Sequence, residues 1–161
     1  MTRWRRWCAI VFEPNVREDP PLRESAPPPR RLSRILVVED EAALRGLLEV
    51  SIRDIGAREV LACGSCAEAL DKAPVFAPDL VVVDLQLVDG DGMTLIAALR
   101  ATPELARTGA VVLTARPDLA TNRAAQTPGV IGVLPKPFDP MSLTETLDAL
   151  WRDAREDHND G

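Results

Sequence analysis

Residues 81–92, VVVDLQLVDGDG, join a strand-forming run to a loop. The three valines predict a strand that is buried on both faces, and the Asp-Gly-Asp-Gly that ends the segment is typical of a loop. Asp84 lies between the two, where the predicted strand leaves the core. Because a carboxylate in such a position is costly unless it is paired, we expect Asp84 to have either a partner or a function.

Short aliphatic runs alternate with helical stretches on both sides of this segment. The predicted strands are RILVV (34–38), REVLAC (58–63), DLVVVD (79–84), GAVVLT (109–114) and VIGVL (130–134). A helical stretch follows each strand, although the one at 117–127 is polar and only weakly helical. This alternation predicts an α/β fold, a doubly wound five-stranded parallel sheet with helices on both faces.

The first and last predicted helices have apolar faces. In the first, the apolar face consists of Leu44, Leu47, Leu48, Ile52 and Ile55, and Gly56 closes the helix. The last helix is expected to open at Asp139 as its N-cap, with Pro140 in the first turn. Its buried face is expected to consist of Leu143, Leu147, Leu150 and Trp151.

Ligands of an open parallel sheet bind beyond the carboxyl ends of its strands. Four of the predicted strand ends carry chemically active side chains, namely Glu39 and Asp40, Asp84, Thr114 and Lys136. Crowded carboxylates repel one another unless a cation lies between them, and a hard ion such as Mg²⁺ prefers oxygen ligands. Asp84 is also a competent nucleophile for a phosphoryl group, which Lys136 and Thr114 could contact. The set therefore predicts a magnesium-dependent phosphoryl site.

Four segments, ILVVEDE, VVVDLQLVDGDG, VVLTA and LPKPF, resemble the signature blocks of response-regulator receiver domains, the phosphoacceptors of two-component signalling. The intervals also agree with that family: 44 residues from Asp40 to Asp84, then 30 to Thr114 and 22 to Lys136. The resemblance covers residues 34–152 and implies the flavodoxin-like strand order 2-1-3-4-5.

The resemblance implies that Asp84 is the phosphoacceptor, taking its phosphoryl group from the phosphohistidine of a sensor histidine kinase or a phosphotransfer protein. It implies that Mg²⁺ is held by Glu39, Asp40, Asp84 and the backbone carbonyl of Gln86. Thr114 and Lys136 would contact the phosphoryl oxygens, and the Lys136–Pro137 peptide bond would be cis. Such a domain catalyses only its own phosphoryl transfer and dephosphorylation, so it is not expected to be an enzyme.

Some positions differ from the family pattern. An aromatic residue often stands three residues before the lysine, where this chain has Val133, and the usual loop proline is Val88. We therefore expect output through the loop after the fourth strand and the weak fourth helix, instead of through a rotating aromatic side chain. Gln86 and Arg116, two residues beyond Asp84 and Thr114, occupy places that tune the access of hydrolytic water, so we expect them to affect the phosphoryl lifetime.

Other functions share parts of this pattern. A phosphatase of the haloacid-dehalogenase type also uses a strand-end aspartate, but it needs a second aspartate two residues later as general acid, where this chain has Gln86. The segment CGSC, residues 63–66, fits a reactive thiol pair at a helix N-terminus. Ser65 and Glu68, however, fit a capping box, which already explains the start of that helix, so we expect Cys63 and Cys66 to be ordinary residues there. The single histidine, His158, is expected to be a solvated tail residue.

Charge and composition predict the surroundings of this domain. Residues 1–33 are rich in Arg and Pro and are expected to be a disordered extension, and residues 153–161 a polar tail. The residues after this extension carry an excess of acidic side chains, which disfavours direct DNA binding because the DNA backbone is also negative.

No apolar run is long enough for a membrane span, and the three cysteines form no disulfide framework, so we expect a bacterial cytoplasmic protein. Only polar residues follow the last helix, so the output is expected to use an unidentified downstream protein, a phosphorylation-dependent dimer being one form of it.

Overall fold

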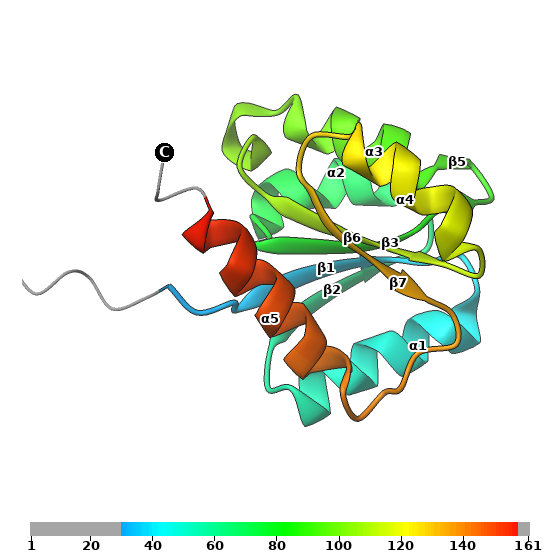
Figure 1. Ribbon diagram of the computed structural model, residues 1–161, viewed down its shortest axis with the longest axis vertical. Helices are drawn as coiled ribbons and strands as arrows, with labels where there is room; N and C mark the ends of the chain where they lie inside the picture. The colour runs from blue at the N-terminus through cyan, green and yellow to red at the C-terminus, as the bar shows by residue number, and fades with distance from the viewer. Residues whose placement is uncertain (1–29, 158–161) are drawn as a thin grey trace, which may run out of the picture. The chain divides into compact units, whose positions relative to one another are not determined.

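The computed structural model describes residues 30–157, and a five-stranded parallel sheet forms its centre. The strands are β1 (Arg34–Val38), β2 (Glu59–Cys63), β3 (Leu80–Asp84), β6 (Gly109–Thr114) and β7 (Val130–Pro135). They lie in the order β2-β1-β3-β6-β7 (Figure 1), which confirms the predicted sheet and its flavodoxin-like order. Residues 1–29 of the expected extension, and His158, lie outside the described residues.

Helices cover both faces of the sheet, as predicted. On one face lie α1 (Ala42–Val50), its π-helical continuation η1 (Ser51–Ile55), and α5 (Leu143–Glu156). The other face is covered by α2 (Cys66–Phe76), α3 (Gly92–Arg100) and α4 (Pro117–Ala125) (Figure 1). A short 3-10 turn, η2 (Pro103–Leu105), follows α3. None of the helices described between residues 30 and 157 combines the length and the apolar character that crossing a membrane would need.

Successive strand residues alternate between two aliphatic cores, one on each face. Val81 and Val83 of β3 face the core beneath α2 and α3, whereas Val82 faces the core beneath α1 and α5. All three valines are at most 3% exposed. This two-sided burial is why the strand is a continuous apolar run with no polar residue before Asp84.

The prediction for the apolar face of the first helix is wrong in part, because two of its five residues are exposed. Leu48 and Ile52 are fully buried, but Leu47 and Ile55 are 42% and 44% exposed. At Ser51 the helix changes from α to π geometry, and the Ser51 hydroxyl donates to the carbonyl of Leu47 at 2.7 Å. A wider turn rotates later side chains away from the face that a 3.6-residue period predicts, so Ile55 leaves the core.

The expected start of the last helix is also wrong. Helix α5 begins at Leu143, with Ser142 as its N-cap residue, not at Asp139. The Asp139 carboxylate instead accepts the backbone N–H of Met141 at 3.0 Å, closing a local turn around Pro140. Such Asx turns compete with helix initiation, because they use the same side-chain acceptor as an N-cap. The predicted buried residues Leu143, Leu147 and Trp151 are in the core.

The CGSC segment begins α2 as a capped helix. The Ser65 hydroxyl accepts the Glu68 N–H at 3.1 Å, and the Glu68 carboxylate accepts the N–H of Gly64 at 2.8 Å. Cys63 and Cys66 are both free thiols, and burial raises the pKa of each to about 11. A reactive thiol pair needs lowered pKa values, so the capping interpretation is favoured.

Leu147 tests the packing of α5, because it is fully buried in the core beneath α1 and α5. We predict that Leu147→Ala lowers the free energy of unfolding by about 2–5 kcal/mol, since the variant loses apolar burial and leaves a cavity. Val75 on α2 is 90% exposed and supplies the control, where Val75→Ala should change it by less than about 0.5 kcal/mol. Urea unfolding measures both variants, and equal losses would contradict this packing.

Candidate functional site

Three carboxylates meet at the carboxyl ends of β1 and β3, and we refer to Glu39, Asp40 and Asp84 as the acidic cluster. One carboxylate oxygen from each lies within 4.8 Å of the others. The parallel register explains this proximity, because Val38 pairs with Val83, and the acidic residues follow directly on both strands. Glu39 is only 1% exposed, Asp84 is partly buried and Asp40 is exposed. The structure therefore brings together the three carboxylates that the sequence analysis singled out.

Lys136 connects two members of the acidic cluster. Its Nζ lies 2.9 Å from Oε2 of Glu39 and 3.1 Å from Oδ2 of Asp84. The lysine reaches this position because its backbone N–H donates to the carbonyl of Thr114 at 2.8 Å, just beyond the end of β7. The Lys136–Pro137 peptide bond is cis, as expected. A side chain 97 residues away from Glu39 in sequence thus supplies its cation.

Burial and pairing act in opposite directions on these charges. Burial raises the pKa of Glu39, and the hydrogen bonds from Lys136 and the N–H of Glu41 only partly oppose it, so the pKa lies above its usual value. Burial lowers the pKa of Lys136, but its hydrogen bonds to Glu39 and Asp84 outweigh this and the pKa is raised. The Lys136 ammonium therefore stays charged across neutral pH, whereas burial disfavours the ionised form of Glu39.

Thr114 ends β6, next to β3 in the sheet. Leu113 is the register partner of Asp84, so Thr114 lies one residue beyond it at the same edge. The Thr114 side chain is 5% exposed, and its hydroxyl accepts the N–H of Arg116 at 3.0 Å. Arg116 is itself exposed at the start of α4, with Nε 3.8 Å from Asp118. Thr114 and Arg116 thus lie at the predicted edge.

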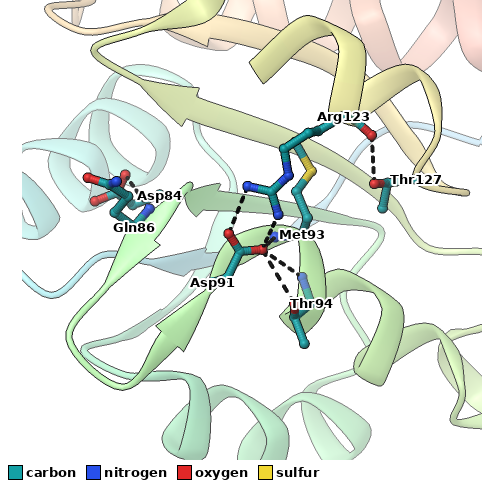
Figure 2. A network of polar contacts seen from close by, with 7 residues as sticks. All are labelled: Asp84, Gln86, Asp91, Met93, Thr94, Arg123 and Thr127. Carbon is teal, nitrogen blue, oxygen red and sulfur yellow. Dashed lines mark hydrogen bonds and ion pairs between the residues drawn. The ribbon is translucent and has the colours of Figure 1, made fainter. Parts of the chain in front are cut away.

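The segment after Asp84 folds back on it. Two short antiparallel strands, β4 (Gln86–Leu87) and β5 (Gly90–Asp91), form a hairpin where the sequence predicted only a loop. The N–H of Gln86 donates to Oδ1 of Asp84 at 3.3 Å, as Figure 2 shows. Gly92 donates to the carbonyl of Leu85 at 2.9 Å, and a Cβ at Gly92 would overlap the Asp84 carbonyl oxygen. Only glycine permits this close return, which places the Gln86 backbone beside the acidic cluster.

Four further residues hold this site together and were not singled out from the sequence. Arg45 on α1 donates to the backbone carbonyls of Glu39 at 2.8 Å and of Asp40 at 3.3 Å. Asp89 accepts N–H groups at the start of α2, Asp91 accepts those at the start of α3, and Arg123 pairs with Asp91. The N-cap role of Asp91 had a local signal, since it directly precedes the helical pattern. The contacts of Asp89 and Arg123 join distant segments and had no local signal, and the Arg45 contact, although only five to six residues long, was not singled out either.

The chemistry of these donors fits Mg²⁺. The acidic cluster offers carboxylate oxygens, and the hairpin brings the backbone of Gln86 next to them. Hard oxygen donors at one open edge are the ligands that Mg²⁺ prefers, and the ion usually keeps several waters.

Val133 stands where the family often has an aromatic residue. Its side chain is partly buried against the core beneath α2 and α3, and it pairs with Val112 in the sheet.

Comparisons with known proteins agree with this arrangement. The family model for the response regulator receiver domain matches residues 35–148. The chain is 35% identical over 107 residues to the KDP operon transcriptional regulatory protein KdpE of Escherichia coli, covering 66% of this chain and 46% of KdpE. It spans about half the length, or less, of the curated transcriptional regulators that it matches.

Solved structures show the same similarity. One is the chemotaxis response regulator CheY4 of Vibrio cholerae, with a TM-score of 0.67, 25% identity, and coverage of 74% of this chain and 98% of that chain. Another is the receiver domain of sensor histidine kinase PA1611 from Pseudomonas aeruginosa PAO1, described with a magnesium ion coordinated in the active site cleft. Its TM-score is 0.65 at 25% identity, covering 74% of this chain and 97% of that one. A family match of this length on a sheet of this order shows that the chain belongs to the response-regulator receiver domains of two-component systems.

Proposed function

We propose that Asp84 is the phosphoacceptor of this receiver domain and takes its phosphoryl group from the phosphohistidine of a sensor histidine kinase or phosphotransfer protein. The contact of the Asp84 carboxylate with Lys136, beside two further carboxylates, is the observation that carries this proposal. Asp84 is partly exposed at the strand end, so a phosphoryl donor can approach it.

The transfer forms one bond and breaks another. Oδ of Asp84 attacks phosphorus, the bond between phosphorus and the imidazole nitrogen of the donor breaks, and the nitrogen keeps the electron pair and takes a proton. Lys136 and the Thr114 hydroxyl would donate to the phosphoryl oxygens as the acyl phosphate forms. Glu39, Asp40, Asp84 and the Gln86 carbonyl would hold Mg²⁺. When bound, that ion supplies positive charge for the transferring oxygens.

Output follows from the charge that the modification adds. A phosphoryl group carries about −1.5 to −2 charges at neutral pH. This negative charge would be added to a site where one ammonium already faces several carboxylates. Such a change can shift the population of two arrangements of the neighbouring loops. We propose that the recipients are a downstream protein or a second copy of the chain, reached through α4 and the loop before it.

Phosphorylation of Asp84 can be tested with a small phosphoryl donor. With Mg²⁺ and acetyl phosphate, intact-mass spectrometry should detect one added phosphoryl group on the wild-type protein and none on Asp84→Asn. Asp89→Asn is the matched control, because Asp89 lies five residues away in the same loop but outside the acidic cluster. The proposal fails if Asp84→Asn is modified as fully as the wild type.

Lys136 should compete with Mg²⁺ for carboxylate oxygens. We predict that Lys136→Met binds Mg²⁺ about tenfold more tightly at neutral pH, since a charge-assisted contact of roughly 1.5–3 kcal/mol no longer holds Glu39 and Asp84. The same variant should accept phosphoryl groups more slowly because it lacks the ammonium that contacts them. Calorimetric titration with Mg²⁺ measures the affinity. Weaker binding in Lys136→Met, with Lys72→Met unchanged, would contradict the predicted competition.

Gln86 and Arg116 are both exposed beside the site, and we propose that their long side chains hinder the water that hydrolyses the acyl phosphate. The double variant Gln86→Asn, Arg116→Ala should therefore lose its phosphoryl group faster than the wild type. The decay of the phosphorylated mass species after removal of the donor measures this lifetime. Equal decay rates would exclude a role for these side chains.

A further inference from the structure

The loop after Asp84 is tied to α4 by an ion pair. Arg123 of α4 donates from Nη1 to Oδ2 of Asp91 at 3.0 Å and from Nη2 to Oδ1 at 2.8 Å. Figure 2 shows this bidentate contact beside Asp84 and Gln86. Its side chains are 51% and 35% exposed, so the pair lies at the surface, but its two-bond geometry fixes orientation as well as distance.

Asp91 is held on a second side by α3. Its Oδ1 accepts the N–H groups of Met93 at 3.0 Å and Thr94 at 3.1 Å, which makes it the N-cap of that helix. Its backbone pairs with Gln86 across the β4–β5 hairpin. Asp91 thus joins helix α3 and helix α4 through its carboxylate, and the strand that carries the Gln86 carbonyl through its backbone.

Helix α4 has few other side chains with which to hold its position. Its buried residues are the small side chains Ala120 and Ala124, and its one large aliphatic residue, Leu119, is 57% exposed. Two buried methyl groups contribute little apolar burial compared with the leucines of α3. The Arg123 pair is therefore a directed side-chain contact between α4 and the loop after Asp84, added to this limited apolar packing.

We propose that Arg123 is a positioning residue: its ion pair with Asp91 aligns the Gln86 carbonyl with the acidic cluster and couples the position of α4 to Mg²⁺ binding. This inference rests on the proposed function, which assigns the carbonyl to the metal. Arg123 itself contacts neither the metal ligands nor the phosphoryl group. Coupling of this kind is reciprocal, so an ion that binds the cluster must stabilise the paired position of α4 by the same factor.

Two single variants separate the pair from the helix cap. Arg123→Met removes the cation, and Asp91→Asn removes the anion but keeps a side-chain oxygen for the N–H groups of α3, since asparagine is a good N-cap. Each should weaken the binding of Mg²⁺ alone by about two- to five-fold, the range that an exposed ion pair can supply. The double variant should be no weaker than either single variant, because the two residues act through one contact. Arg123→Lys should be intermediate.

Lys72→Met is the matched control, because it breaks the comparably exposed ion pair with Glu68 on α2. Calorimetry with Mg²⁺ gives the affinities, and urea unfolding establishes that each variant is folded. Amide hydrogen exchange gives a second readout: Mg²⁺ should slow exchange in α4 of the wild type and not of Arg123→Met.

The outcomes distinguish this inference from the function on which it rests. If the wild type binds Mg²⁺ and is phosphorylated on Asp84, while Arg123→Met matches its affinity and its exchange response, the positioning role is wrong and the proposed function stands. Additive effects in the double variant would also overturn the coupling. If the wild type binds no Mg²⁺, both proposals fall together.

Discussion

Lys136 brings its ammonium to 2.9 Å from Glu39 and 3.1 Å from Asp84, and this contact offsets the repulsion among three carboxylates at one edge of the sheet. Glu39 is almost entirely removed from water, and burial favours the protonated form of any carboxylate. One ammonium compensates for part of this cost. A divalent cation could compensate for more of it, because the acidic cluster offers the oxygen ligands that such an ion prefers.

The fold brings these charges together without exposing the core. Parallel strands that are buried on both faces must be aliphatic along their length, so polar chemistry is confined to their ends. The register places the ends of β1, β3 and β6 side by side, and the turn after β7 adds the lysine. The site therefore combines residues from four segments that are remote in sequence, each placed at or just beyond the end of a strand of the sheet.

The segment after Asp84 serves as more than a connection. Asp89 holds it to α2 and Asp91 holds it to α3 and α4, so every helix on that face touches the hairpin beside the phosphoacceptor candidate. Both aspartates have lowered pKa values. The backbone N–H groups of Cys66 and Ala67 lower that of Asp89, whereas burial raises that of Asp91 and its bonds to Arg123 and Thr94 outweigh it. These anchors remain ionised across neutral pH, so the loop has the same attachments in all such conditions.

Local patterns in the sequence were sufficient to predict the strands, their parallel arrangement and the five polar groups at the strand ends. Strands buried on both faces are continuous aliphatic runs, and the loops that follow them begin with polar residues, so both can be recognised over a few residues. Matching to family blocks supplied the roles expected of those groups. Local patterns did not predict the π-helical turn at Ser51 or the start of α5 at Leu143, and at both places a side-chain hydrogen bond accompanies the change in backbone geometry. Nor did they predict that Arg123 meets Asp91, 32 residues earlier, or that Arg45 braces the Glu39 carbonyl. The sequence contains many arginines and aspartates, and only the packing of helices against the sheet determines which of them meet.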